Sequence, residues 1–362
     1  MITDTGYSAF SRRVHEAAAR GGSPVDGAIE LTRRCNLNCA HCFIREDSPR
    51  GELEGGEIRR LLDEISGAGC LWLLMTGGEP LTREDFPDIY LHAKRRGLIV
   101  TLFTNGTLID ESTARLLEKA RPFFVEITLY GATRQTYESM TGVRGSYDAC
   151  IGGIELLLKH NVPLALKTMI TTINRHELAL MKGIARSLGL RFRYDPVIHP
   201  RLDGSRSPYG VRVTPEEVVQ LDIDDEERTR EWIALRGKFN GTASAETLFN
   251  CGAGRDSFHI TSRGRLRVCE LVPLPDYDLR RNGFMDGFRL FPGIAARRLK
   301  GARTCAGCEN LLFCSSCPGL SMLEGDRAGE RPVDYHCAVA SMRAKYIPRE
   351  MEREKEKDLQ ET

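Results

Sequence analysis

Three cysteines, Cys35, Cys39 and Cys42, gather in the stretch RCNLNCAHC. Thiolates are soft ligands that suit zinc or iron–sulfur clusters. Four cysteines close a cubane cluster, whereas three leave one iron without a protein ligand, and an open metal position is typical of a reactive site. His41 is an alternative fourth ligand for zinc, but it directly precedes Cys42, which makes joint tetrahedral ligation awkward. The spacing therefore favours an iron–sulfur site with one open position.

A second stretch whose residues could bind a ligand is GGEP at residues 77–80, which directly follows the apolar run LWLLMT. Gly77 and Gly78 can let the backbone approach a ligand closely. Glu79 offers a carboxylate to an ammonium group. Alone the pattern is weak, because strand-to-helix turns often use Gly and Pro. Its place at the end of a strand that follows the cysteine loop makes it a candidate binding turn.

The C-terminal third holds more cysteines. The segment FHITSRGRLRVCE predicts a hairpin that turns at Arg263 and Gly264. A C-x2-C-x5-C-x2-C pattern follows, and paired C-x2-C knuckles are typical of zinc sites. Five residues between the pairs are few for a two-knuckle site, and one zinc would leave three cysteines unused. The cysteines of this region are Cys251, Cys269, Cys305, Cys308, Cys314, Cys317 and Cys337.

The elements that position these residues alternate between short β-branched runs and helical stretches. Such alternation predicts a parallel sheet, with the loops gathered at the carboxyl ends of the strands. Six repeats are two short of an eightfold barrel, so we expect an α/β fold with a partial (β/α)6 TIM-like barrel. Strands are expected at 28–32, 71–76, 98–104, 123–130, 162–171 and 190–197, and helices at 57–69, 84–97, 111–120, 147–160 and 175–189.

The same pattern predicts the domain organisation. A polar lead-in of one helix at 1–26 precedes the barrel at 27–200, and a turn-rich linker with an acidic, solvent-facing helix follows at 201–250. A short-stranded, cysteine-rich domain is expected at 251–345, and a charge-dense, frayed helical tail at 346–362.

Composition excludes several classes of protein. The chain has 362 residues, and 51 Lys and Arg against 50 Asp and Glu give a net charge of +1. This balance gives no electrostatic reason to expect a nucleic acid or an anionic membrane as partner. No apolar run has the length of a membrane span, and the N-terminal residues show no export signal. Twelve cysteines in a long chain without such a signal indicate metal ligation in a reducing, cytoplasmic setting.

The first cysteine loop, C-x3-C-x2-C with a ring residue before its last cysteine and directly after the first strand, resembles the radical S-adenosylmethionine (radical SAM) superfamily. The resemblance implies that Cys35, Cys39 and Cys42 hold a [4Fe–4S] cluster. The amino and carboxylate groups of S-adenosylmethionine would chelate its fourth iron. One electron from the cluster would then release methionine and a 5′-deoxyadenosyl radical, which takes a hydrogen atom from substrate.

The resemblance also implies contacts to S-adenosylmethionine. The GGEP turn matches the superfamily motif that contacts the methionyl amino group. At the fourth strand the sequence reads ITLYGAT, and Thr128 keeps the hydroxyl where relatives often carry serine. The residues expected at the cofactor are His41, Gly77, Gly78, Glu79, Pro80 and Thr128.

The C-terminal cysteines resemble the SPASM extension of radical SAM proteins, which holds auxiliary iron–sulfur clusters. Its C-x9–15-G-x4-C element matches Cys251, Gly264 and Cys269. The resemblance assigns one closed cluster to Cys305, Cys308, Cys314 and Cys337, and another to Cys251, Cys269 and Cys317. Relatives usually have three residues before the last of these, whereas only Ser315 and Ser316 precede it here. The three-cysteine site is therefore expected to have an open iron or to hold a [2Fe–2S] cluster.

The two resemblances together predict an oxidoreductase-type enzyme that modifies peptides. Maturation of a ribosomally synthesised peptide (RiPP) by crosslinking, epimerisation or oxidation is the favoured function. The alternatives are protein oxidation of the anaerobic sulfatase-maturase type, and modification of a small molecule such as an aminoglycoside or a cofactor precursor. An electron carrier is disfavoured, since it has no use for an open cluster or a GGEP turn. Expected partners are a peptide substrate and an electron donor such as flavodoxin or ferredoxin. Because few residues precede the first strand, a leader peptide is expected to need a separate recognition protein or to dock directly on this chain.

Polar residues at the strand ends are the candidates for substrate contact. An unpaired Lys167 inside the apolar fifth strand would be costly, so it is expected to face the barrel lumen or to pair with a carboxylate. Cys70 and Cys150 are expected to pack in the core, as buried free cysteines commonly do. The substrate candidates are Tyr130, Lys167, Asp195 and His199.

Overall fold

The computed structural model describes residues 6–46, 48–238, 249, 251, 253–297, 305, 308–314, 317–325 and 331–360. The chain divides into two compact units. Unit 1 comprises Met1–Asp195 and Cys251–Ala295, and unit 2 comprises Pro196–Asn250 and Ala296–Thr362. Among the described residues, no helix combines the length and the apolar character that crossing a bilayer requires.

Unit 1 is built on a nine-stranded sheet with the order β6-β5-β4-β3-β2-β1-β7-β8-β9. The six strands predicted from the sequence are all present, and each pairs in parallel with its neighbours. The predicted parallel α/β architecture is therefore confirmed. The six strands are β1 Asp26–Thr32, β2 Trp72–Gly77, β3 Ile99–Thr104, β4 Phe124–Thr128, β5 Leu164–Met169 and β6 Arg191–Asp195.

The C-terminal segment extends this sheet, which the sequence did not predict. β7 (Ser257–Ile260) pairs in parallel with β1, so that Ala28 faces His259 and Ile29 faces Ile260. β8 (Arg265–Cys269) and β9 (Val272–Asp278) add antiparallel strands beyond it. The predicted hairpin turn is present, with Gly264 at a positive φ of 73°. Residues 251–295 thus belong to the same compact unit as the barrel.

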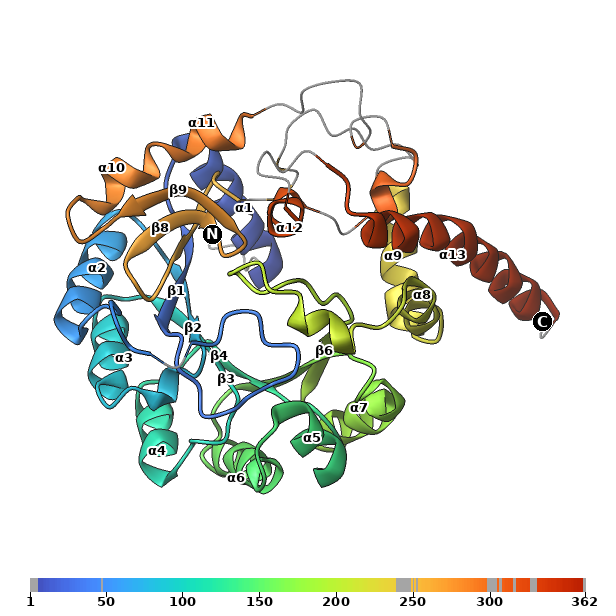
Figure 1. Cartoon of the computed structure of the whole chain (residues 1–362), viewed down its shortest axis with the longest axis horizontal. Helices are drawn as coiled ribbons and strands as arrows, with labels where there is room; N and C mark the ends of the chain where they lie inside the picture. The colour runs from blue at the N-terminus through green and yellow to red at the C-terminus, as the bar shows by residue number, and fades with distance from the viewer. Residues whose placement is uncertain are drawn as a thin grey trace, which may run out of the picture. The chain divides into compact units, whose positions relative to one another are not determined.

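Helices connect the parallel strands and lie along the outer side of the strand row (Figure 1). Their apolar faces explain this position: Ile58, Leu61, Leu62 and Ile65 of α2 are fully buried. Cys70 and Cys150 are buried in this unit, as expected. The helices of unit 1 are α1 Tyr7–Gly21, α2 Gly55–Gly67, η1 Pro80–Thr82, α3 Phe86–Arg95, α4 Glu111–Lys119, α5 Arg134–Thr141, α6 Ser146–Lys159, η2 Arg175–Glu177, α7 Leu178–Ser187, α10 Phe284–Phe288 and α11 Phe291–Ala295.

Unit 2 is helical in its described part. The acidic segment after the linker was expected to face solvent, but α8 buries Val218, Val219 and Asp222. The Asp222 carboxylate lies 2.6 Å from Nε of Arg343 on α13, and both side chains are almost fully buried. The helices of unit 2 are η3 Ser207–Val211, α8 Pro215–Ile223, α9 Glu226–Lys238, η4 Leu311–Phe313, α12 Pro318–Leu323 and α13 Asp334–Gln360.

Candidate active site

A cavity of about 280 Å³ opens at the carboxyl ends of the parallel strands. In α/β proteins this end of the strands is where ligands bind. Ten of the thirteen residues predicted for the cysteine loop, the cofactor and the substrate line it, although they come from five different strand ends or loops. Those residues are Cys35, Cys39, His41, Cys42, Gly77, Gly78, Thr128, Tyr130, Lys167 and Asp195.

The three cysteines of the first loop lie close enough to influence one another electrostatically. Burial raises the pKa of Cys35 to about 11, and the neighbouring Cys42 adds to the effect. The pKa of Cys39 is raised further, by burial and then by Cys42 and Cys35. The negative charge of Cys35 and Cys39 is therefore disfavoured unless a cation joins them. Together with Cys42, these thiols are a fitting donor set for an iron–sulfur cluster, in which each thiolate binds a different iron. Among the described residues, no three His, Cys, Asp or Glu side chains are grouped for a single ion.

The loop is held in place by backbone hydrogen bonds to α5. The Asn38 N–H donates to the Thr141 carbonyl at 2.8 Å, and the Ala40 N–H donates to Met140 at 2.9 Å. Gly142 ends this helix with a φ of 66°, and its missing side chain leaves room for the loop, since a Cβ there would lie 3.2 Å from the Asn38 carbonyl oxygen. The sequence did not predict α5, so this support was missed.

Two N–H groups point at the first cysteine sulfur. The Leu37 N–H lies 3.4 Å from Sγ of Cys35, and Nδ2 of Asn105 lies 3.8 Å from the same atom. Asn105 directly follows β3 and also donates to Asn36 at 2.9 Å. Hydrogen bonds to the sulfurs of a cluster tune its reduction potential. Asn105 was overlooked in the sequence, although a polar residue at the end of a parallel strand was a usable signal.

The two glycines of GGEP are required by the protein's own backbone. A Cβ on Gly77 would lie 2.2 Å from the Thr32 carbonyl oxygen, and one on Gly78 would lie 2.3 Å from the Arg34 carbonyl oxygen. The Gly78 N–H donates to Thr32 at 2.8 Å, and the Glu79 N–H donates to Arg34 at 2.9 Å. The turn is therefore fixed against the start of the cysteine loop, and its backbone faces the cavity.

Glu79 does not line the cavity. Its carboxylate is fully buried and accepts hydrogen bonds from the Leu81 and Asn105 N–H groups and from the Thr104 hydroxyl, at 2.7 to 3.0 Å. Burial raises its pKa to about 7, against the lowering effect of these donors. The carboxylate thus joins the ends of β2 and β3, and its contact with the cofactor stays a prediction. Pro80 follows as the buried first residue of η1.

Three further predicted residues line the wall of the cavity around the cysteines. The ring of His41 lies 5.2 Å from that of Tyr130, and both side chains are nearly buried. Burial, with Cys39 as the next cause, raises the pKa of Tyr130 well above its usual value, so its hydroxyl stays protonated. Thr128 ends β4 and is 8% exposed. Their roles at the cofactor or substrate stay predictions.

The opposite wall carries charged residues. Nζ of Lys167 lies 3.2 Å from the Glu126 carboxylate and 3.2 Å from the centroid of the Phe103 ring. Arg193 forms two hydrogen bonds of 2.5 Å to Glu126. Burial lowers the pKa of Lys167 to about 8, although Glu126 opposes the shift. The expectation that Lys167 either faces the lumen or pairs with a carboxylate is confirmed on both counts.

Two carboxylates complete this wall. Asp195 ends β6 and faces Met169 in the register of β5 and β6. Glu270 lies in the tight turn between β8 and β9, and burial raises its pKa, which nearby His259 and Lys167 partly offset. Nothing in the sequence pointed to Glu270, because it is far from the barrel in the chain. A carboxylate whose pKa is raised toward the working pH is better suited to proton transfer than an ordinary one.

The second group of predicted ligands lies in unit 2. Burial raises the pKa of Cys337, and Cys314, Cys305 and Cys308 each add to the effect, so these four thiols lie near one another. Of the other trio, Cys251 and Cys269 belong to unit 1 and Cys317 to unit 2. Ser315 and Ser316, at which the spacing departs from the SPASM pattern, lie outside the described residues.

One substrate candidate is not part of the cavity lining. His199 belongs to unit 2, and its Nδ1 lies 2.9 Å from the Pro200 carbonyl oxygen. Arg193 is the residue that sequence reasoning should have chosen, because it lies two positions before Asp195 and alternate residues of a strand share a face.

Comparison with known proteins agrees with this geometry. Residues 29–183 match the radical SAM superfamily. The chain is 28% identical over 333 residues to the AdoMet-dependent heme synthase of Methanosarcina barkeri, covering 84% of this chain and 94% of the relative. It is 25% identical to the mycofactocin maturase MftC of Mycobacterium tuberculosis, covering 93% and 90%. Three further curated relatives are matched over 36% to 56% of their own length.

The fold has a solved counterpart. SuiB of Streptococcus suis, bound to its precursor peptide SuiA, superimposes with a TM-score of 0.66 at 17% identity, covering 91% of this chain and 80% of that one. The residues that match the family, 29–183, include the three-cysteine loop and lie in the barrel. Residues 29–183 therefore form a radical SAM domain, which belongs to a class that uses S-adenosylmethionine and a [4Fe–4S] cluster.

Proposed function

We propose that this enzyme abstracts a hydrogen atom from a peptide substrate and takes part in maturing that peptide. The observation that carries the proposal is the cavity itself. It brings Cys35, Cys39 and Cys42 to the same space as the GGEP turn and a wall of polar residues. When bound, the cluster and S-adenosylmethionine supply a carbon-centred radical that abstracts hydrogen.

The chain's own residues have separable roles in this proposal. The three thiolates hold the cluster, and the Leu37 and Asn105 N–H groups stabilise negative charge on Sγ of Cys35. The backbone of Gly77 and Gly78 borders the place for the methionyl group. Tyr130, Lys167, Arg193 and Asp195 contact the substrate, and Glu270 exchanges a proton with it.

A peptide substrate is supported by the comparisons. MftC is named a maturase, and SuiB is seen with a precursor peptide. We further propose that flavodoxin or ferredoxin donates the electron and that a separate protein presents the leader peptide. We also propose that the enzyme acts in the reducing cytoplasm, where cysteines stay reduced and available as metal ligands.

We also propose auxiliary iron–sulfur clusters. The proximity of Cys305, Cys308, Cys314 and Cys337 supports a closed four-thiolate cluster that serves structure or electron transfer. Cys251, Cys269 and Cys317 would hold a second cluster with an open iron, or a [2Fe–2S] cluster. Iron and sulfide analysis of a variant without the first three cysteines tests this assignment. Zinc in place of iron would refute it.

A small carboxylated molecule is the second candidate substrate, and one specific observation favours it. Heme synthases of two organisms match the chain over 94% and 93% of their own lengths. Lys167 and Arg193 carry two positive charges on the cavity wall, and Glu126 neutralises one of them. Carboxylate groups of a tetrapyrrole are suited to such a wall.

The experiment that separates the two candidates is a coupled turnover assay. The reconstituted enzyme is given S-adenosylmethionine with either the short peptide encoded beside its gene or a carboxylate-bearing iron tetrapyrrole. Formation of 5′-deoxyadenosine above the substrate-free rate, with a matching mass change in one substrate, identifies the class. Acceleration by the tetrapyrrole alone would refute the peptide proposal. A variant with alanine at all three loop cysteines is the negative control.

A further inference from the structure

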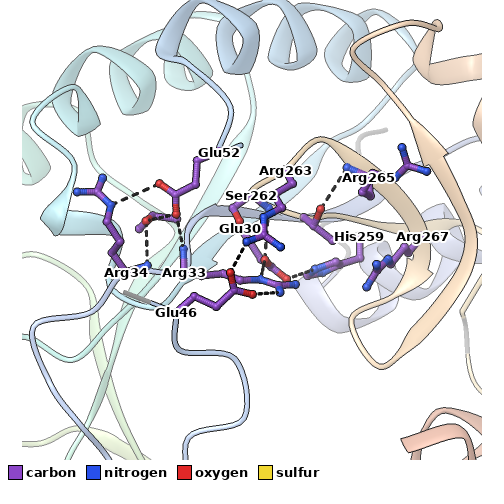
Figure 2. Close-up of polar contacts among 12 residues, drawn as sticks. Glu30, Arg33, Arg34, Glu46, Glu52, His259, Ser262, Arg263, Arg265 and Arg267 are labelled. Carbon is purple, nitrogen blue, oxygen red and sulfur yellow. Dashed lines mark hydrogen bonds and ion pairs between the residues drawn. The ribbon is translucent and has the colours of Figure 1, made fainter. Parts of the chain in front are cut away.

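A buried polar network links the base of the cysteine loop to the C-terminal hairpin, and its centre is Glu30 on β1 (Figure 2). Oε1 of Glu30 lies 2.8 Å from Nε2 of His259 on β7. Oε2 accepts from Nε of Arg33 at 2.9 Å and from the Ser262 N–H at 3.3 Å. The side chain is fully buried. Burial raises the pKa of Glu30, but His259 and then Arg33 outweigh it and hold the value at about 2.

Arg33 closes the cysteine loop at its base. Its NH1 lies 2.9 Å from the Glu46 carboxylate, and its carbonyl oxygen accepts the Glu46 N–H at 3.1 Å. Residues 33 and 46 bracket the three cysteines. Arg33, which pairs with Glu30, therefore holds the two ends of the cysteine loop together. Glu46 also contacts Arg263 of the hairpin, as Figure 2 shows.

Glu52 fixes the same stretch from the other side. Its Oε1 accepts from the Thr32 hydroxyl at 2.7 Å and from the Arg33 N–H at 2.9 Å. The next residue, Leu53, donates its N–H to the Ser262 carbonyl at 2.7 Å. Several independent contacts therefore join the loop base, residues 52–53 and the hairpin turn. Glu30 differs from the other residues of the network because its side chain is fully buried and connects β1 to both Arg33 and the hairpin.

The β7–β8 hairpin, which these contacts hold in place, leads directly to a residue that lines the cavity. β8 ends at Cys269, and Glu270 follows it on the cavity wall. On the other side, the Arg34 carbonyl accepts the Glu79 N–H and so connects the loop base to the GGEP turn. S-adenosylmethionine is proposed to bind between the cysteine loop and the GGEP turn. A shift of Arg33 would therefore change the distance between these two parts of its binding site.

We infer that Glu30 is a positioning residue, which holds the cysteine loop, the GGEP turn and the Glu270 hairpin in one fixed geometry for S-adenosylmethionine binding. The inference rests on the proposed role of Cys35, Cys39 and Cys42 as cluster ligands. It does not depend on whether the substrate is a peptide or a tetrapyrrole. Glu30 touches neither the cysteines nor the cavity, and it acts through Arg33, His259 and Ser262.

The test is Glu30→Gln, which keeps the size of the side chain and removes its charge. The matched control is Glu57→Gln, because the half-buried Glu57 also pairs with a C-terminal arginine, Arg280 at 2.9 Å, but its other partner is the Glu54 N–H of the α2 cap and not the base of the cysteine loop. We expect Glu30→Gln to keep its iron and its melting temperature close to those of the control. The KM for S-adenosylmethionine in substrate-free cleavage should rise about tenfold, the scale seen for outer-shell partners of metal sites.

A spectroscopic readout separates positioning from folding. The paramagnetic resonance spectrum of the reduced cluster should respond differently to added S-adenosylmethionine in Glu30→Gln than in the wild type and in Glu57→Gln. Should Glu30→Gln fail to fold, His259→Asn removes the same contact from the hairpin side and should give the same change in KM and spectrum. A folded variant with the control's KM and spectrum would overturn the inference. So would loss of iron and fold in both variants, which would make the network structural only. Because no substrate is present, failure of the peptide proposal leaves this result intact.

Discussion

Two adjacent glycines in α6 offer a test of how the fold supports the site. Gly153 packs against the loop after β3, where a Cβ would lie 2.1 Å from the Gly106 carbonyl oxygen. Gly106 directly follows Asn105, whose amide points at Sγ of Cys35. Gly152 is one residue earlier in the same helix and faces open space, because a Cβ added there would have no atom within 4 Å. We predict opposite effects for Gly153→Ala and Gly152→Ala.

The magnitude follows from two terms. Alanine is favoured over glycine in a helix interior by about 1 kcal/mol, so Gly152→Ala should stabilise the protein by about that amount. Gly153→Ala gains the same helix propensity, but overpacking costs about 1–3 kcal/mol. The clash is not relieved by a side-chain rotation, because the clashing atom is the backbone oxygen of Gly106. The difference between the variants should therefore be about 1–3 kcal/mol, or about 3–10 °C in melting temperature for a unit of this size.

The assay is thermal unfolding of the cluster-free protein, followed by substrate-free formation of 5′-deoxyadenosine after reconstitution. Gly153→Ala should melt below Gly152→Ala and cleave S-adenosylmethionine about tenfold more slowly, because the amide of Asn105 moves from the sulfur of a cluster ligand. Gly152→Ala should keep wild-type activity. Equal melting temperatures for the two variants would refute the packing argument, and a destabilised Gly153→Ala with unchanged cleavage would refute the link to Asn105.

The loop cysteines and two buried ionisable groups give the remaining predictions. Alanine at Cys35, Cys39 and Cys42 should abolish 5′-deoxyadenosine formation and remove about four irons per chain; unchanged cleavage would refute the ligand assignment. Because the folded-state pKa of Lys167 is about 8 and its ordinary value is 10.5, the unfolded chain binds more protons between them. Stability should rise with pH across that window in urea unfolding, and Lys167→Met should remove the rise. The pKa of Glu79 is raised from 4.5 to about 7, so its contribution to stability should fall as pH rises between these values, and a wild-type slope in Glu79→Gln would contradict this.

The sequence predicted the parallel part of the fold because each β/α repeat is a local pattern. All six expected strands are present, and their ends bring the cysteine loop, the GGEP turn and Thr128 to one cavity. The short helix α5 was missed, since Arg134–Thr141 holds several Thr and Ser residues and has no long apolar stripe. Thr133 caps the start of this helix and Gly142 its end, and the cysteine loop adds two hydrogen bonds to its last carbonyl groups.

The long-range part of the structure could not be predicted in the same way. The contact of Glu30 with Ser262 joins residues 232 positions apart, and neither neighbourhood hints at the other. β7 reads as half of a hairpin, and its parallel pairing with β1 depends on an edge left open by a barrel with too few strands. Glu270 reaches the cavity only through this pairing. Residues of the site that depend on it were therefore hidden from sequence patterns.

The GGEP turn lies at the cavity as the sequence predicted, but the contacts that require its residues differ from the expected ones. The sequence suggested that Gly77 and Gly78 make room for a ligand and that Glu79 meets an ammonium group. The structure assigns the space beside both glycines to the backbone of Thr32 and Arg34, and it encloses the Glu79 carboxylate between β2 and β3. Substitutions in this turn should therefore act first through the geometry of the cysteine loop. The backbone of the turn is the part that faces the cavity, so a displaced turn would also change the wall beside the proposed S-adenosylmethionine site.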